Sequence, residues 1–348
     1  MKNIFLKFWS KKGLRNTVIV LASIIWIWII FAIIPPTVAI ADNPFIVDEG
    51  EGPMIAAHRG GKTLNPENTF LAFDYAIDQF SIEMLELDLA LTKDNELVAI
   101  HNLSINAVSD VELVTGSSDE YLVSEHTLEE LRLFNYGYRF VDRSGNRPYE
   151  NLVTPSQIDR RSVIADNHLQ MVTIGDIFDA YYDSDLLFTV EIKDSEETGK
   201  KAVDVLNGFL VNNARYPNGN LVNRVAIGTF HNEIEEYIKT TYPNLLRGGS
   251  VGEVTKFVLT QLLGVNLFDN SSFVCLQIPT SEEAFNVNIK LDRKTFINRA
   301  HRRHISVQYW TINDEETMRH LIGLGADVIM TDDPELLYEV LQDMGYRD

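Results

Sequence analysis

Two short runs of residues carry the side chains from which chemistry can be expected. His58 ends the apolar segment 53–58, a predicted strand, and Arg59 follows it directly. Glu86 and Asp88 alternate with leucine in the next predicted strand, 84–89, and side chains two residues apart in a strand point the same way. An imidazole, a guanidinium and paired carboxylates together predict a site for metal-assisted phosphodiester chemistry.

A third pair of charged residues repeats this pattern. Glu191 and Lys193 lie two residues apart at the end of the predicted strand 187–192. Burying acids side by side is costly unless a cation compensates them, and a salt bridge with lysine or arginine is the ordinary alternative. Three converging carboxylates, Glu86, Asp88 and Glu191, instead favour an oxygen-binding divalent ion, Mg²⁺ or Ca²⁺, over zinc. Lys193 is then expected to neutralise a phosphate oxygen.

His101 and Trp310 are further candidates. His101 ends the apolar segment 97–100, where a lone histidine is usually structural. Phosphodiester cleavage, however, needs one group to accept a proton and another to protonate the leaving alkoxide, and imidazole exchanges protons near neutral pH. Trp310 lies inside the predicted strand 305–312, where it either packs in the core or lines a substrate pocket. The other histidines are interpreted as surface or structural residues: His126, His168, His231, His301, His304 and His320.

Strand-like and helix-like segments alternate from residue 53 to the end of the chain. The candidate strands are 53–58, 84–89, 187–192, 224–230, 245–248, 273–278, 305–312 and 327–331. Eight strands alternating with helices predict an α/β fold, a (β/α)₈ TIM barrel, although a doubly wound open sheet shows the same alternation. The barrel is favoured because the charged residues gather at the carboxyl ends of strands.

Two segments depart from this regular alternation. The stretch 102–170 is longer than one strand-to-helix connection needs, so we expect a small insertion over the mouth of the barrel, where it would shape substrate entry. A plain surface loop is the alternative. The apolar segment 253–268 is predicted as an outer helix packed on the barrel, with docking on a membrane or an acyl chain as the alternative.

The charge distribution limits the partners of the chain. The 348 residues carry a formal net charge of −20, and the first 41 residues hold five basic and no acidic side chains. Residues 42–348 alone therefore carry a net charge of −25. A body this acidic is not expected to bind nucleic acid through a general basic surface, and its charge disfavours adhesion to anionic lipid.

The N-terminal region has the composition of a membrane anchor. We interpret residues 1–15 as a basic cytoplasmic segment, 16–36 as a transmembrane anchor, 37–52 as a linker and 53–345 as the barrel. Ala39-Ile40-Ala41 resembles a signal-peptide cleavage site, so a cleaved leader is the alternative. The positive-inside rule then predicts a single-pass protein of the cell membrane whose barrel is extracytoplasmic. The lone Cys275, in an apolar setting, is interpreted as buried packing.

The order of the motifs resembles the glycerophosphodiester phosphodiesterase family from about residue 53 to 340. The matching motifs are His58-Arg59-Gly60, Pro66-Glu67-Asn68-Thr69 with Ala72-Phe73, Glu86-x-Asp88, His101, Glu191-Ile192-Lys193, Tyr309-Trp310-Thr311-Ile312-Asn313 and the run 325–334. Each motif alone is a weak signal, but seven in register are a strong one. The resemblance implies a TIM barrel with a small insertion after the second strand.

The resemblance also implies roles for individual residues. It implies a divalent metal at Glu86, Asp88 and Glu191, an acid/base pair at His58 and His101, and phosphate binding at Arg59. Glu67 would orient either Arg59 or the first loop. The chain departs from the family pattern at three places, where it has Asn102 after His101, Thr229 before Phe230, and Val172 before Thr173. None of these changes removes an expected ligand or either histidine, although Asn102 alters how His101 is held.

The expected function is metal-dependent hydrolysis of glycerophosphodiesters to glycerol 3-phosphate and an alcohol by a membrane-anchored, extracytoplasmic enzyme. Soluble head-group diesters, lysophospholipids and a glycerol-phosphate polymer of the cell envelope are all possible substrates. Two alternatives stay open. A lyase of the phospholipase type would use the same histidine pair and end at a cyclic phosphate, and a non-catalytic envelope-binding protein would keep the barrel alone.

Overall fold

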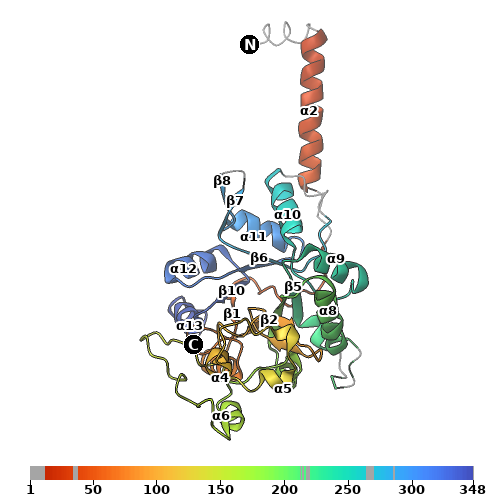
Figure 1. Cartoon of the computed structure of the whole chain (residues 1–348). Coiled ribbons are helices and arrows are strands. Elements are labelled where there is room, and N and C mark those ends of the chain that lie inside the picture. Colours follow the sequence, from red (N-terminus) through yellow and green to blue (C-terminus); the bar gives the residue numbers. More distant parts are fainter. Residues whose placement is uncertain are drawn as a thin grey trace.

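The computed structural model describes residues 12–33, 38–211, 213, 215–216, 220–263, 270–284 and 287–347. Residues 1–11 of the predicted basic segment, residues 34–36 of the predicted anchor and residues 264–269 of the segment 253–268 lie outside this description. A long N-terminal helix, α2 (Lys12–Ile33), precedes a barrel of strands surrounded by helices (Figure 1).

Seven parallel strands form the barrel. Their order around it is β5 (Val225–Gly228), β4 (Leu187–Ile192), β2 (Met84–Leu91), β1 (Met54–His58), β10 (Val328–Thr331), β9 (Ser306–Tyr309) and β6 (Cys275–Ile278). The chain order and the parallel pairing confirm the predicted (β/α)₈ barrel.

The eighth predicted strand, 245–248, is shorter than expected. It pairs only through isolated bridges, from Arg247 to Ile227 of β5 and from Gly248 to Cys275 of β6. The Gly248 amide donates to the Ile227 carbonyl at 2.9 Å, and the Gly249 amide donates to the Cys275 carbonyl at 3.0 Å. These bonds join the two edge strands, so residues 246–249 close the barrel without forming a regular strand.

Helices cover the outside of the barrel (Figure 1). They are α3 (Phe70–Phe80), α7 (Ile174–Tyr181), α8 (Glu196–Leu210), α9 (Asn232–Thr241), α10 (Val251–Leu263), α11 (Lys294–His301), α12 (Glu315–Leu324) and α13 (Pro334–Asp343). The last helix has a capped start, because the Asp333 side chain accepts from the Leu336 amide with Pro334 in the first turn. In α10, Phe257 is fully buried and meets Phe273 edge to face, as expected for an outer helix packed on the barrel.

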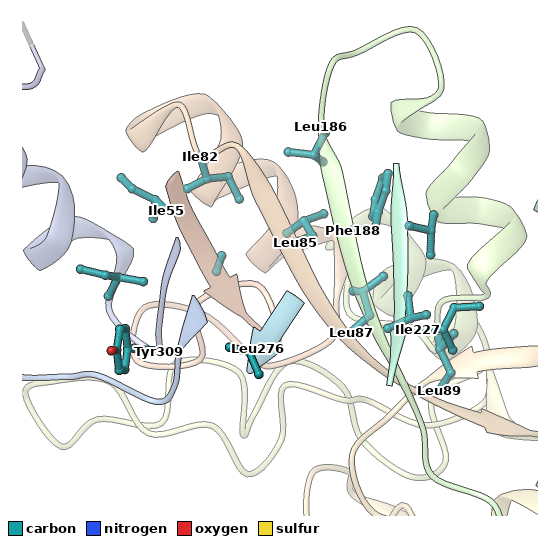
Figure 2. Packing of buried hydrophobic residues seen from close by; sticks show 14 of the residues in the cluster. Ile55, Ile82, Leu85, Leu87, Leu89, Leu186, Phe188, Ile227, Leu276 and Tyr309 are labelled. Atoms are coloured by element: carbon teal, nitrogen blue, oxygen red, sulfur yellow. The ribbon is translucent and has the colours of Figure 1, made fainter. Parts of the chain in front are cut away.

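The alternation of side chains along the strands creates two apolar layers. Outward-facing residues such as Ile55, Leu85 and Phe188 pack against the surrounding helices (Figure 2). Inward-facing residues such as Met84 and Leu187 form a separate cluster inside the barrel. Every residue of β2 is buried, including its acids, because one face meets the helices and the other lines the barrel interior.

Cys275 belongs to the inner cluster and is fully buried. Burial raises the pKa of its thiol to about 12. A thiol that is both enclosed and protonated is a poor nucleophile, which agrees with its interpretation as packing.

The long connection after β2 contains an antiparallel strand and several short helices. β3 (Leu97–Ala99) pairs with the end of β2, and the chain then forms α4 (Val111–Thr115), η1 (Val123–Glu125), α5 (Leu128–Leu131) and α6 (Arg160–Asp166). This region has its own apolar cluster, which includes Val111, Leu131 and Phe134. Also not predicted from the sequence were the 3₁₀ turn η2 (Asn220–Asn223) and the antiparallel pair of β7 (Ser281–Ala284) and β8 (Val287–Lys290).

A buried ion pair holds this connection together, and its loss should destabilise the protein. The Arg160 guanidinium contacts the Asp110 carboxylate, and both side chains are almost fully buried. Asp110 also accepts from the Asn135 amide at 2.9 Å. Asp110→Ala would leave a buried guanidinium unpaired, so we expect a loss of about 3–5 kcal/mol in the free energy of unfolding.

Urea denaturation would measure that loss. The exposed ion pair between Glu129 and Arg161 of the same region supplies the control, because water screens the pair and Glu129→Ala should leave the free energy of unfolding close to the parental value. Equal stability of the two variants would contradict a structural role for the buried pair.

Helix α2 is the candidate membrane span. Its window Gly13–Ile30 has a mean hydropathy of 1.8 and none of its residues is buried against the rest of the chain, so it is long and apolar enough to cross a membrane. A signal sequence can have the same length and composition.

Candidate active site

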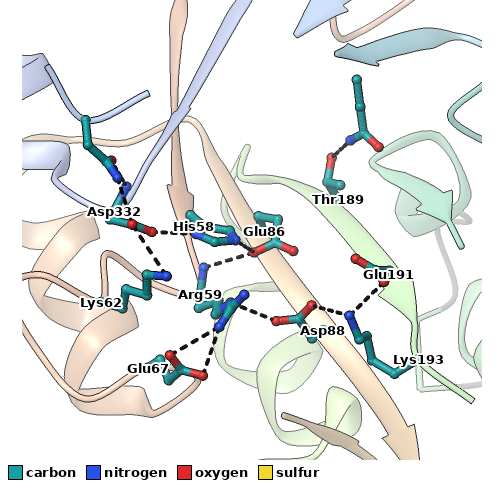
Figure 3. Close-up of polar contacts among 12 residues, drawn as sticks. His58, Arg59, Lys62, Glu67, Glu86, Asp88, Thr189, Glu191, Lys193 and Asp332 are labelled. Carbon is teal, nitrogen blue, oxygen red and sulfur yellow. Dashed lines mark hydrogen bonds and ion pairs between the residues drawn. The ribbon is translucent and has the colours of Figure 1, made fainter. Parts of the chain in front are cut away.

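Charged side chains from four strand ends meet inside the carboxyl end of the barrel (Figure 3). The parallel register sets His58 of β1 beside Glu86 of β2, and Asp88 of β2 beside Glu191 of β4. Asp332 follows the last residue of β10, on the other side of β1. The candidate residues at the ends of β1, β2 and β4 are therefore brought together. Their side chains project inward because they alternate with the outward leucines and alanines.

His58 is held by a partner that the sequence analysis did not identify. Its Nδ1 lies 2.5 Å from Asp332 Oδ1, and its Nε2 lies 3.8 Å from Glu86 Oε2. His58 and Asp332 are each 8% exposed, so the pair is shielded from water. Because an ionised carboxylate can only accept, this bond places a proton on Nδ1 and leaves Nε2 facing the site.

Asp332 is itself fixed on its other side. Its Oδ2 accepts from Asn313 Nδ2 at 2.8 Å and lies 3.5 Å from Lys62 Nζ. Burial alone would raise the pKa of Asp332, but the contacts with His58, Lys62 and Asn313 outweigh it and lower that pKa below its usual value. The run 325–334 contains Asp332, but nothing in the sequence distinguishes it from the neighbouring Asp333, which caps α13.

The two acids of β2 have different surroundings. Burial, together with the negative charges of Asp88 and Glu191, raises the pKa of Glu86 well above its usual value. Asp88 lies between two cations, with Arg59 Nε 3.1 Å from Oδ2 and Lys193 Nζ 3.7 Å from Oδ1. Lys193 also donates to Glu191 Oε1 at 2.8 Å. Salt bridges with arginine or lysine were the ordinary alternative to a metal ion in the sequence analysis. The described structure contains such salt bridges at Asp88 and Glu191.

Arg59 adopts a backbone conformation that is rare for a residue with a side chain. Its φ is 55°, in the left-handed region, which costs about 1–3 kcal/mol. Its amide donates to Glu86 Oε2 at 3.0 Å, and its guanidinium donates to both oxygens of Glu67 at 3.2 and 3.3 Å. These bonds hold the guanidinium inside the site, with Glu67 as one of its partners.

The donor set fits a divalent cation in its chemistry. Glu86 and Asp88 are nearly fully buried, and Asp88 Oδ2 accepts no hydrogen bond although Arg59 Nε is close to it. A buried carboxylate oxygen without a donor, next to two further carboxylates, is what a cation would satisfy. In the part of the chain that the structure describes, however, no three acids, histidines or cysteines lie close enough together to form a ready-made metal site.

His101 and Trp310 are not joined to this cluster by any polar contact among the described residues. His101 follows Ile100, whose amide donates to the Asp88 carbonyl at 2.8 Å, so its backbone lies beside β2. Its Nδ1 is 2.8 Å from Asn102 Oδ1. Trp310 is half-buried against the inner cluster, and its buried indole nitrogen makes no hydrogen bond.

The fold and the site define a TIM-barrel hydrolase whose acids, imidazole and cations lie at the carboxyl ends of the strands, where enzymes of this fold have their active sites. Comparison with known proteins gives the family. The chain belongs to the glycerophosphoryl diester phosphodiesterase family, whose model matches residues 58–336. The resemblance predicted from the motifs is confirmed, and with it the expected enzyme class, a phosphoric diester hydrolase.

Individual relatives agree with this assignment. A glycerophosphodiester phosphodiesterase from Caldanaerobacter subterraneus subsp. tengcongensis is 25% identical over 84% of this chain and 99% of its own. One from Bacillus altitudinis is 22% identical over 83% of this chain and 98% of its own.

Solved structures show the same fold. The glycerophosphoryl diester phosphodiesterase domain of a Mycobacterium tuberculosis protein matches with a TM-score of 0.64 and 15% identity, covering 83% of this chain and 99% of that one. An Oleispira antarctica phosphodiesterase in complex with the product sn-glycerol-3-phosphate matches with a TM-score of 0.57 and 18% identity, covering 84% and 97%.

Proposed function

We propose that this chain is a membrane-anchored, extracytoplasmic and metal-dependent phosphodiesterase that hydrolyses glycerophosphodiesters to glycerol 3-phosphate and an alcohol. The observation that carries the proposal is the His58–Asp332 pair, whose free Nε2 faces the buried acids of β2. An imidazole oriented by a carboxylate is suited to move a proton at a reacting oxygen.

Glu86, Asp88 and Glu191 are the residues that would hold the metal, with Mg²⁺ or Ca²⁺ as the expected ion because all the donors are carboxylates. When bound, the ion would supply charge neutralisation at the phosphodiester oxygens. Family members generally depend on a divalent metal, which supports this part of the proposal. Asp88 would exchange its contacts with Arg59 and Lys193 for contacts with the ion.

Arg59 and Lys193 would then bind the phosphodiester oxygens. Both cations reach Asp88 in the described structure, so a phosphate placed beside that carboxylate is within range of the guanidinium and the ammonium. A guanidinium held by Glu67 presents its remaining N–H groups in a fixed direction, which favours an anion of matching shape. Trp310, with an unsatisfied indole N–H, would line the pocket for the glycerol moiety.

Proton transfer would be divided between the two histidines. His58 holds its proton on Nδ1 against Asp332, and Nε2 is free to accept or return a proton at the substrate. His101 has the corresponding arrangement with Asn102, which leaves its own Nε2 free. We assign the roles of base and acid to His58 and His101 jointly. The nucleophile would be water or the glycerol 2-hydroxyl, and the other imidazole would protonate the departing alcohol.

The proposal is tested by the release of glycerol 3-phosphate from glycerophosphocholine by the full chain in detergent. Release with Mg²⁺ or Ca²⁺ that falls by at least about a hundredfold in EDTA is expected, because several kcal/mol of charge stabilisation would be lost. Phosphorus NMR of the products separates a hydrolase from a lyase that stops at a cyclic phosphate. No release from glycerophosphocholine with any ion would move the test to lysophospholipids and glycerol-phosphate polymers. If those are not cleaved either, the proposal is refuted and the binding-protein alternative is favoured.

A further inference from the structure

Residues 38–47, called the strap below, follow α2 and lie on the amino-terminal rim of the barrel. The Ala39 amide donates to the Arg303 carbonyl at 2.8 Å. The Asn43 carboxamide donates to the Val274 carbonyl at 2.7 Å. Val274 directly precedes β6 and Arg303 shortly precedes β9, so both partners lie where parallel strands begin. The strap is therefore bound to the end of the barrel opposite the charged site.

Phe45 fixes the strap from inside the barrel. Its side chain is fully buried and belongs to the same apolar cluster as Met84, Leu187 and Val328. These three residues are the first of β2, β4 and β10. Phe45 thus fills the amino-terminal opening of the barrel, whereas His58 ends its strand at the opposite opening.

The tether between α2 and the strap is short. Helix α2 ends at Ile33, and Ala39, six positions further along the sequence, makes the first rim contact among the described residues. Six residues span about 20 Å when fully extended, so the rim must stay within about that distance of the end of α2. From Met84 to Asp88, β2 rises about 13 Å away from the rim, since a strand advances about 3.3 Å per residue.

The connection that contains α4–α6 extends the barrel further on the side of the site. The Arg143 guanidinium contacts the carboxylates of Asp333 and Glu335, which begin α13 directly after Asp332. This part of the chain therefore stands on the carboxyl end of the barrel. It adds to the distance between the anchored rim and the outermost parts around the mouth.

We propose that the anchored chain holds the amino-terminal rim toward the bilayer and the mouth of the site away from it, so that the enzyme acts on water-soluble glycerophosphodiesters and not on diester lipids of its own membrane. This inference rests on the proposed anchoring and the proposed activity. A lipid in the anchoring bilayer would have to leave its leaflet entirely to reach His58, at the cost of exposing its acyl chain to water.

Fluorescence resonance energy transfer from a dye on the protein to an acceptor in the bilayer tests the orientation independently of catalysis. Arg302→Cys places a thiol on the rim, and Ser144→Cys places one on the connection beside Arg143; both positions are exposed. The native thiol, Cys275, is fully buried, so the unsubstituted chain serves as the labelling control. Each full-length variant is reconstituted in phosphatidylcholine vesicles that contain an acceptor-labelled lipid, and is labelled from outside with a membrane-impermeant maleimide donor.

We expect transfer from residue 302 to exceed transfer from residue 144 by about twofold or more, given the tether length and the rise of the barrel. Lengthening the tether with a flexible Gly-Ser insert between residues 33 and 38 should lower transfer from residue 302. Equal or greater transfer from residue 144 would overturn the proposed orientation. Absence of transfer at both positions would overturn it too, because the anchoring itself would then be wrong.

The substrate preference is measured in the same vesicles. Glycerol 3-phosphate release from dissolved glycerophosphocholine should be at least about tenfold faster than release from lysophosphatidylcholine placed in the same bilayer, because desolvating one acyl chain costs many times RT. Equal rates would refute the substrate inference. If neither compound is cleaved, the proposed function fails, while energy transfer still decides the orientation on its own.

Discussion

His58→Ala is expected to lower kcat/KM for glycerophosphodiester hydrolysis by about a thousandfold, the usual contribution of a positioned general acid or base. The residue is 8% exposed, its Nδ1 is engaged by Asp332 and its Nε2 faces Glu86. No other side chain in the described cluster places an imidazole nitrogen there. Steady-state release of glycerol 3-phosphate would measure the effect.

The companion variant Asp332→Asn should reduce the rate by a smaller factor, because it disturbs the proton position on His58 without removing the imidazole. Adding Asp332→Asn to His58→Ala should then change little, since residues that act as one unit are not additive. His320→Ala is the matched control: His320 is exposed, pairs with Asp292 on the surface at 3.1 Å, and should retain the parental rate. A fully active His58→Ala variant would remove His58 from the mechanism.

Glu86→Gln should separate activity from stability. The amide keeps the shape of the side chain and can still accept from the Arg59 amide, but it removes one of three neighbouring negative charges. We expect the metal-dependent rate to fall by about a thousandfold, equivalent to about 4 kcal/mol of lost charge stabilisation. The metal-free variant should unfold at the same temperature as the parent or higher, because a buried charge next to Asp88 and Glu191 is gone.

Thermal unfolding with and without metal would make this distinction. The parent should gain about 2.7 kcal/mol at a metal concentration one hundred times the dissociation constant, and Glu86→Gln should gain little. Glu112→Gln provides the control, because Glu112 pairs with Arg139 in the long connection after β2, away from the cluster. A metal-induced shift that survives Glu86→Gln would show that the ion binds elsewhere or that two carboxylates suffice.

The sequence was a good guide wherever the argument needed only local geometry. Glu86 and Asp88 share a face because side chains alternate along any strand, so their approach could be predicted without knowing the fold. The alternation of strands and helices predicted the barrel, and the motifs in register predicted the family, which its model confirms. The strand predicted at 245–248 was overestimated, since this segment forms only isolated bridges. An apolar run does not reveal how many backbone hydrogen bonds its neighbours can supply.

Contacts between distant segments could not be read in the same way. His58 and Asp332 are 274 positions apart, and they meet only because β10 pairs with β1 when the barrel closes. The strap is similar: nothing about Phe45 in the sequence indicates that it fills the opening formed by strands that begin at Met84, Leu187 and Val328. Sequence alone therefore determined which side chains are available and which of them share a strand face. Only the tertiary structure decided their partners and the direction of the site, because strand closure, not chain proximity, sets those distances.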